Sequence, residues 1–227
     1  MTNKLSCMRL TKSVEDYLKA IFKIVNETKN AKVGTNQLAE YLNITPASAS
    51  NMLRKLKANK LVTYQKYGKL NLTKKGEVIA VRLLRKHRLW ETFLYEQMNF
   101  SWDEVHEVAH QLEHIESSKL ISELDKFLNY PTHDPHGDVI PKEDGRYTKT
   151  YKITLSEVKE SQACTLVSVK DNSAKFLKYV TQIGLALSSE IKILEIRDFD
   201  HSMLISFDNK TENVSRKFAE NVFVELI

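Results

Sequence analysis

The sequence contains few cysteines and no long apolar run. Only Cys7 and Cys164 occur among its 227 residues, without CxxC spacing, so neither a disulfide framework nor a thiolate zinc site is encoded. No apolar run approaches the about 18 residues that a membrane span needs, and residues 1–13 lack the apolar core of a signal peptide. We therefore expect a folded cytoplasmic protein of one to three small domains, with no membrane partner.

Acidic residues are scarce in the first third of the chain. Residues 1–75 hold 15 Lys and Arg against 4 Asp and Glu, a net charge of +11; since the whole chain carries +5, residues 76–227 carry −6. This asymmetry predicts a polyanionic partner for the first part, most often nucleic acid, although a merely solvated basic surface would give the same charge. The sequence has no phosphate-binding glycine loop, and we expect no small organic substrate.

The first third has the element order of a winged helix. Apolar residues at helical spacing follow Ser13, a candidate cap, and predict a first helix. Thr35 can cap a short second helix that ends near Leu42, and after a tight turn Pro46 suits the first turn of a third. Residues 61–73 alternate in β fashion around Gly68 and predict a two-stranded hairpin, and residues 74–98 return to helix.

The third of these helices has a polar face suited to DNA. Ser and Asn can hydrogen-bond base edges, and Arg can contact guanine or phosphate. An ordinary amphipathic surface helix is the alternative, but the basic charge and the hairpin favour DNA binding. The candidate DNA-binding residues are Thr35, Pro46, Ser48, Ser50, Asn51, Arg54 and Lys55.

The remainder of the chain divides at a loop. From Trp102 to Asn129 the pattern is helical, with a break near Ser117, and residues 129–146 form a loop rich in Pro, Gly, His and Asp. Residues 151–171 and 188–208 predict strand pairs, and residues 173–185 a short helix between them. We expect a small β-barrel-like domain at the C-terminal end.

The segment VHEVAHQLEH carries four potential metal ligands. On a helix, His106, His110, Glu113 and His114 share about 100° of arc, beside the apolar stripe and not within it. Imidazoles and a carboxylate at this spacing can chelate a metal ion, and a solvated helix flank is the lesser alternative. The segment also contains HEVAH, which matches the HExxH motif of zinc peptidases.

Two further groups of ionisable residues accompany this segment. His87 and Glu91 stand four apart on an otherwise apolar face, where they need each other or a metal as a partner. Asp16 can be a ligand or the carboxylate of a capping box with Ser13. In the loop, His133, Asp134 and His136 can complete a second site or simply be exposed.

With SVEDYLKAIF, RKHRLWE, VHEVAHQLEH and YPTHDPHGDVIP in this order and spacing, the chain resembles the diphtheria-toxin-repressor family of metal-dependent transcriptional repressors, in particular its manganese-regulator branch. The resemblance covers nearly the whole length. It implies a mainly α fold with small β parts: a winged helix-turn-helix over residues 1–75, a helical dimerisation and metal-binding domain over 76–147, and an SH3-like (FeoA-like) domain over 148–227. It also implies a homodimer that binds double-stranded operator DNA.

The resemblance further implies two metal sites per subunit. Candidates for one site are Asp16, His87, His110, Glu113 and His114; candidates for the other are Glu91, Asp134, His136 and Asp171, with His106 as an alternative. His110 stands where relatives usually have Cys or Glu, and Asp134 where many have Cys. Oxygen and nitrogen ligands alone fit Mn²⁺ or Fe²⁺, with Zn²⁺ as the alternative.

Three functions therefore remain to be distinguished. The chain is expected to be a metal-activated repressor that controls metal-ion uptake and homeostasis genes, and not an enzyme. A zinc metallopeptidase using residues 106–110 would need Glu107 beside a zinc-bound water, and Glu107 points about 100° from His106. A DNA-binding architectural protein would bind DNA without a metal.

Overall fold

The computed structural model describes residues 10–27, 34–63, 70–146, 152–171 and 173–227. They form two compact units. The first comprises Met1–Lys86, Glu113–Glu116 and Pro141–Tyr147, and the second comprises His87–Leu112, Ser117–Ile140 and Thr148–Ile227. Among the described residues, no helix is both long and apolar enough to cross a membrane.

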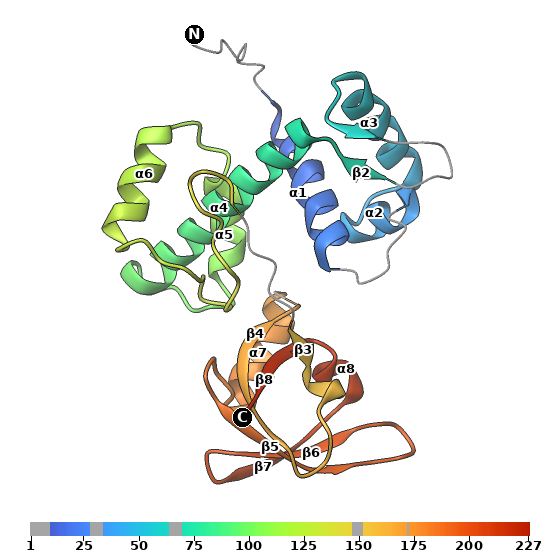
Figure 1. Ribbon diagram of the computed structural model, residues 1–227, viewed down its shortest axis with the longest axis vertical. Helices are drawn as coiled ribbons and strands as arrows, with labels where there is room; N and C mark the ends of the chain where they lie inside the picture. The colour runs from blue at the N-terminus through green and yellow to red at the C-terminus, as the bar shows by residue number, and fades with distance from the viewer. Residues whose placement is uncertain (1–9, 28–33, 64–69, 147–151, 172) are drawn as a thin grey trace. The chain divides into compact units, whose positions relative to one another are not determined.

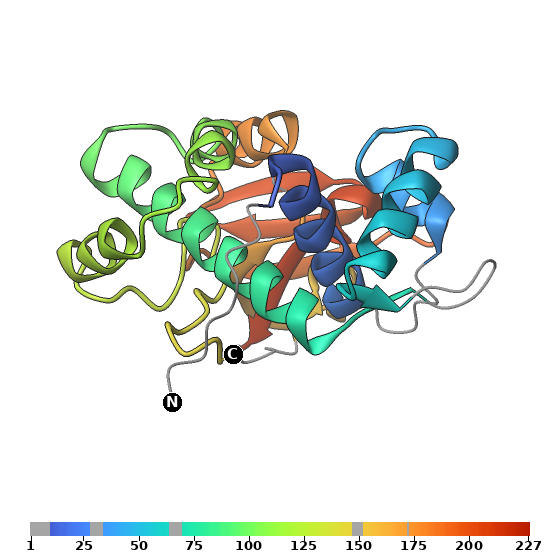
Figure 2. The same cartoon turned by 90° about the horizontal axis from the view of Figure 1, so that it is seen from above.

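The first unit has the winged-helix order that the sequence predicts. It contains α1 (Lys12–Glu27), α2 (Thr35–Tyr41), α3 (Pro46–Ala58), β1 (Val62–Thr63), β2 (Asn71–Leu72) and the start of α4 (Lys74–Gln97). Leu18 and Ile21 of α1, Leu53 of α3 and Leu84 of α4 meet in one buried core. The first half of α4 thus packs beside α1 (Figures 1 and 2).

The helix starts in this unit differ in part from the prediction. The first helix begins at Lys12, and Thr11 takes the capping role expected of Ser13, since its Oγ1 accepts from the Val14 N–H at 3.4 Å. Thr35 lies inside α2, whose N-cap is Gly34, so the prediction of a Thr35 cap was wrong. The expected start at Pro46 is confirmed, with Thr45 Oγ1 accepting from the Ser48 N–H at 3.3 Å.

The predicted hairpin is present where the structure describes it. The short strands β1 and β2 pair antiparallel, with Val62 opposite Leu72 and Thr63 opposite Asn71. The turn expected around Gly68 lies outside the described residues.

The second unit begins with three helical segments around a core of their own. The rest of α4, α5 (Val105–Leu112) and α6 (Ser118–Phe127) enclose Leu89, Val105, Ala109 and Leu124. The predicted break is confirmed, because Ser117 caps α6 by accepting from the Leu120 N–H at 3.2 Å.

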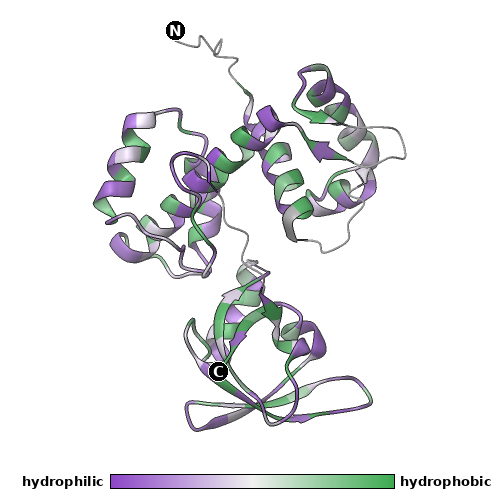
Figure 3. Ribbon diagram, in the orientation of Figure 1, coloured by the Kyte–Doolittle hydropathy of each residue, from purple (hydrophilic) through white to green (hydrophobic). Residues whose placement is uncertain are grey.

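The C-terminal part of this unit is a six-stranded antiparallel sheet in the order β3-β8-β4-β5-β6-β7 (Figure 1). Apolar and polar residues alternate along its strands, visible as green and purple in Figure 3, and the apolar set fills one core. Both β3 and β4, expected to form a pair, instead pair with β8. The strands are β3 (Ile153–Thr154), β4 (Ala163–Val169), β5 (Glu190–Ile196), β6 (Met203–Phe207), β7 (Lys210–Val214) and β8 (Val222–Leu226), accompanied by η1 (Leu155–Glu157), α7 (Ala174–Ile183) and α8 (Arg216–Ala219).

The thiol of Cys164 offers a test of how closed this sheet core is. Burial raises its pKa to about 11, so at pH 8 its thiolate fraction should be about two orders of magnitude below that of an exposed thiol. In a Cys7→Ser variant, we expect Cys164 to react with a disulfide reagent only slowly until denaturant unfolds the domain. Labelling of the native protein at the rate of free cysteine would contradict this burial.

Candidate metal centres

Three imidazoles converge on one buried carboxylate in the second unit. Glu91 and His87 lie one turn apart on α4, and Glu91 Oε1 is 3.0 Å from His87 Nε2. The same oxygen is 3.0 Å from His106 Nδ1 of α5 and 3.8 Å from His136 Nδ1 of the 131–140 loop. Glu91 and His87 are each 1% exposed, whereas the His106 side chain is 39% exposed, so the cluster reaches the surface at His106.

The loop adds a second carboxylate and a histidine with a defined tautomer. Asp134 Oδ1 accepts from the backbone N–H groups of His136 at 2.8 Å and Asp138 at 3.0 Å. His136 Nε2 lies 2.8 Å from the Trp102 carbonyl, which can only accept, so Nε2 carries the proton and Nδ1 of the neutral ring keeps its lone pair. A metal-binding histidine is typically oriented by this kind of contact.

Two buried atoms of this loop lack a hydrogen-bond partner among the described residues. They are Asp134 Oδ2 and His136 Nδ1. The nearest cation to Asp134 Oδ2 is Arg88, whose Nε is 3.4 Å away, while its guanidinium donates to the Val139 carbonyl and to Asp138. Buried polar atoms are rarely left unsatisfied, so these two atoms point to a bound cation.

The electrostatics of the two carboxyls differ. Burial by itself would raise the pKa of Glu91, but His87, His106 and His136 together hold it well below its usual range. Burial raises the pKa of Asp134 to about 6, with further contributions from the charges of Asp138 and Glu91, while Arg88 and His136 oppose the rise. A divalent cation beside Asp134 would favour its ionised form.

The loop is fastened to the C-terminal sheet. Gly137 has a φ of +78°, and a Cβ there would lie 1.9 Å from the Val167 carbonyl oxygen of β4. Lys152 Nζ donates to the Gly137 carbonyl at 2.9 Å and to Ser168 Oγ at 2.6 Å. Trp102 stacks on His136 and donates from its indole to Thr181 Oγ1 of α7 at 2.8 Å. The position of His136 therefore depends on this sheet and α7.

Another group of candidate ligands lies in the first unit, where α1 meets residues 113–116. Asp16, Glu113 and His114 each offer a ligand atom within 4.8 Å of the others. His114 Nε2 is 3.3 Å from Asp16 Oδ1 and 3.7 Å from Glu113 Oε1. On the other side of the ring, His114 Nδ1 lies 2.6 Å from Glu15 Oε2, so a proton on Nδ1 leaves the lone pair of the neutral ring on Nε2, the nitrogen that faces Asp16 and Glu113.

The two histidines of HEVAH do not share one group. Among the described residues, His106 groups with His87 and Glu91, and His110 does not belong to that group. Glu107 is exposed, and its carboxylate accepts from Gln111 at 3.4 Å. The geometry is therefore not that of a peptidase, in which both histidines hold one zinc ion beside the glutamate.

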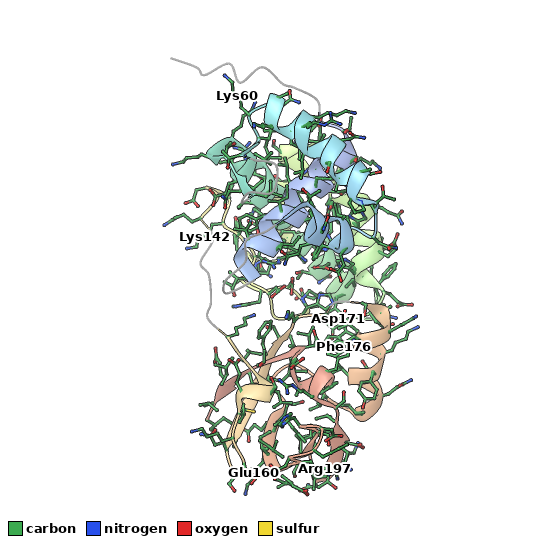
Figure 4. The ribbon with its side chains drawn as sticks, turned by 90° about the vertical axis from the view of Figure 1, so that its right-hand side faces the viewer. Lys60, Lys142, Glu160, Asp171, Phe176 and Arg197 are labelled. Carbon is green, nitrogen blue, oxygen red and sulfur yellow. The ribbon has the colours of Figure 1, made fainter. Side chains whose placement is uncertain are left out.

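Two expected ligands lie elsewhere than the sequence suggested. His87, expected with Asp16, is held by Glu91 because of their i, i+4 spacing on α4. Asp171 belongs to none of the clusters found among the described residues; its Oδ1 accepts from the Ser173 N–H at 2.8 Å ahead of α7. Figure 4 shows Asp171 and Phe176 at one end of the C-terminal domain, with Glu160 and Arg197 at the other. The use of Asp171 stays a prediction.

Four residues around these groups were missed by sequence reasoning. Glu15 and Lys19 contact His114 and Glu113, and Arg88 and Trp102 contact Asp134 and His136. Glu15 has the signature of an ordinary first-turn acid, and the others are common helix or loop residues. Only the adjacency of Glu15 to Asp16 and of Arg88 to His87 could have drawn attention to them.

The donor sets fit a divalent metal. Both consist of carboxylate oxygens and imidazole nitrogens, which suit Mn²⁺, Fe²⁺ or Zn²⁺. Glu91, Glu113, Asp134 and His136 are buried, and the unpartnered Asp134 Oδ2 and His136 Nδ1 belong to the group that includes Glu91. In these positions a metal would supply positive charge that links separate segments of the chain.

The predicted DNA-binding residues lie around the helix-turn-helix. Along α3, Pro46, Ser48, Asn51, Arg54 and Lys55 are exposed, while Ser50 and, on α2, Thr35 are half-buried. The Arg54 guanidinium donates to Asn51 Oδ1 one turn away. The polar face expected from the sequence is thus open to solvent within the first unit.

Three family descriptions match successive parts of the chain. Residues 9–70 match "Iron dependent repressor, N-terminal DNA binding domain", residues 73–142 match "Iron dependent repressor, metal binding and dimerisation domain", and residues 153–226 match "FeoA domain".

Individual relatives are similar over most of their own length. The HTH-type transcriptional regulator MntR of Geobacillus kaustophilus is 32% identical over 124 residues, which are 55% of this chain and 86% of that protein. A solved manganese-dependent transcriptional repressor in complex with manganese is 33% identical, with a TM-score of 0.87 over 94% of this chain and 100% of that chain. The manganese regulator SloR is 35% identical, with a TM-score of 0.81 over 96% of this chain and 100% of that chain.

The close approach of Gly137 to β4 predicts that this glycine positions the two candidate metal ligands that precede it, Asp134 and His136. In Gly137→Ala, the added Cβ should push the loop away from Val167 and displace Asp134 and His136. We expect metal affinity at this group to fall about 10- to 100-fold, as for loss of other ligand-orienting contacts, measured by titration calorimetry.

Gly145→Ala is the matched control for this substitution. Gly145 also has a positive φ, +82°, but nothing lies within 4 Å of an added Cβ. It carries the backbone strain without the clash, so metal affinity should stay near that of the unaltered protein. Equal effects of the two substitutions would contradict a positioning role for the Gly137 contact.

Proposed function

The chain belongs to the iron-dependent repressor family of metal-dependent, DNA-binding transcriptional repressors, and from this we propose which metal activates it, which residues bind the metal and how binding affects DNA recognition. Its activator is Mn²⁺, with Fe²⁺ or Zn²⁺ as alternatives, at about two ions per subunit. It acts in the cytoplasm as a homodimer on double-stranded operator DNA, and it controls genes of metal-ion uptake and homeostasis. The family consists of transcriptional regulators and not of enzymes.

We assign the domains and ligands as follows. Residues 1–75 bind DNA, residues 76–147 bind metal and dimerise, and residues 148–227 form the SH3-like domain. The first metal site uses Asp16, Glu113 and His114, with His110, which the sequence places four residues before His114, as the further ligand. The second site uses Glu91, His106, Asp134 and His136, with His87 beside them.

The single observation that carries this proposal is the position of Asp16. It lies on α1, whose apolar residues build the winged-helix core, and its carboxylate is 3.3 Å from His114 of the metal-binding segment. A metal bound by both residues would hold α1 in place and fix the distance between the two recognition helices of a dimer, so that they fit successive major grooves.

The experiment that tests this proposal is a gel-shift series on the promoter region of the chain's own gene. Binding should require Mn²⁺, Fe²⁺ or Zn²⁺, with the order of potency identifying the activator, and chelation should abolish it. Sequence-specific binding that survives chelation would instead indicate a DNA-binding architectural protein.

Arg54 is expected to contact DNA, because it is exposed on α3 and held by Asn51. Arg54→Ala should weaken operator binding by about 1–3 kcal/mol if the guanidinium contacts a base in bidentate fashion, and by less if it contacts only phosphate. Arg54→Lys keeps the positive charge but loses the planar guanidinium that can donate to two base atoms at once. It should therefore weaken binding if Arg54 contacts a base and have little effect if Arg54 contacts only phosphate. Unchanged affinity of Arg54→Ala across a salt series would remove this residue from the interface.

His114→Ala should lower metal affinity and abolish metal-dependent DNA binding while the fold is retained, because its Nε2 faces Asp16 and Glu113. Calorimetry and gel shift measure the two effects, and circular dichroism checks the fold. Glu107→Gln is the matched control on the preceding helix: as an exposed side chain it should keep both properties, whereas a zinc peptidase could not lose it. Metal binding by His114→Ala at the original affinity and stoichiometry would show that this site is misassigned.

A further inference from the structure

The ammonium group of a lysine is paired with the carboxylate of one proposed metal ligand. Lys19 lies one turn after Asp16 on α1, and its Nζ donates to both carboxylate oxygens of Glu113, at 2.5 and 2.8 Å. The Glu113 side chain is 0% exposed and that of Lys19 is 12% exposed. The ammonium thus compensates a carboxylate that has no access to water, in a pair that spans 94 residues of sequence.

The lysine and a metal ion would compete for the same oxygen atom. Glu113 Oε1 is the oxygen nearest to Lys19, at 2.5 Å, and it is also the one that faces His114 Nε2, at 3.7 Å. A divalent ion that binds Glu113 and His114 through bonds of about 2.0–2.2 Å would approach this oxygen from beside the ammonium. Two cations so close in a buried setting repel each other strongly.

The Lys19 ammonium can move away from Glu113. Its charge sits at the end of a flexible four-carbon chain, and its partial exposure gives the ammonium a path to solvent. Glu113 has no such freedom, because it is fully buried between α1 and its own segment. Metal binding can therefore exchange one cation for another at a fixed carboxylate.

We propose that Lys19 is a built-in competitor for the first metal site: it neutralises Glu113 in the metal-free protein and must leave that carboxylate when the metal binds. This role rests on the proposed function of Asp16, Glu113 and His114 as ligands. Lys19 lowers the metal affinity of the site and so raises the metal concentration at which the repressor becomes active. It also keeps α1 joined to residues 113–116 when no metal is present.

The test compares Lys19→Gln with Lys23→Gln in the full-length protein, with Mn²⁺ as the titrant. Lys23 lies one turn further along α1, is half-buried and carries the same charge, so it controls for the general loss of a positive charge. We expect Lys19→Gln to raise the Mn²⁺ affinity of the first site by about tenfold or more, and Lys23→Gln to change it by less than about threefold. Lys19→Arg, which keeps a cation on Glu113, should not raise it.

Thermal unfolding provides an independent measurement. Without metal, Lys19→Gln should melt at a lower temperature than the unaltered protein, because Glu113 loses its cation. With saturating Mn²⁺ the difference should largely vanish. If the metal-free variant does not fold, recovery of its circular dichroism on Mn²⁺ addition reports the same exchange.

The outcomes separate this inference from the proposed function. An affinity for Mn²⁺ in Lys19→Gln equal to that of the unaltered protein, or raised no more than in Lys23→Gln, overturns the competitor role, as does an equal loss of stability with and without metal. If His114→Ala meanwhile abolishes binding, the metal site itself stands. If His114→Ala binds Mn²⁺ normally, the site assignment fails and the competitor role fails with it.

Discussion

The burial of three carboxylates, Glu91, Glu113 and Asp134, is the constraint on which the rest of this structure depends. Removing an ionised carboxyl from water costs on the order of several kcal/mol unless cations or hydrogen-bond donors surround it. Glu113 has Lys19, Glu91 has three imidazoles, and Asp134 has two backbone N–H groups with Arg88 nearby. The groups that satisfy Glu113 come from α1, and those that satisfy Glu91 come from α4, α5 and the 131–140 loop. Compensation of charge therefore determines which segments must lie together.

The helices that carry these carboxylates and their partners also build the hydrophobic cores. On α1, Leu18 and Ile21 face the winged-helix core while Asp16 and Lys19 face Glu113 and His114. On α4, Leu89 and Trp90 pack with the helical core while His87 and Glu91 form the ligand cluster. Because one backbone serves both faces, a metal ion that holds the polar face also restrains the packed face. In the proposed function, this is the physical route from metal binding to the position of the DNA-binding helices.

Sequence periodicity was sufficient for features set by local spacing. It predicted the long helix now seen as α4, the break before α6 and the start of α3 at Pro46. It was wrong in placing Glu113 and His114 on one helix with His110, because α5 ends at Leu112. It could not predict features set by distant partners. Lys19 and Glu113 are 94 residues apart, His136 owes its tautomer to the backbone carbonyl of Trp102, and β8 separates β3 from β4. In each case the residue type at one position leaves many partners open, and tertiary packing selects one.

The HEVAH segment shows why a motif needs its partners before it indicates a chemistry. The i, i+4 spacing places His106 and His110 near one another on a helix, but it does not oblige both rings to face one ion. His106 is held through Nδ1 by Glu91 and His87 of α4, and His110 does not belong to that group among the described residues. Glu107 lies on the exposed side and belongs to none of the candidate metal-binding groups found among the described residues. Local spacing thus defines a face of the helix, and the charged groups that other segments bring to that face decide which of its side chains come together.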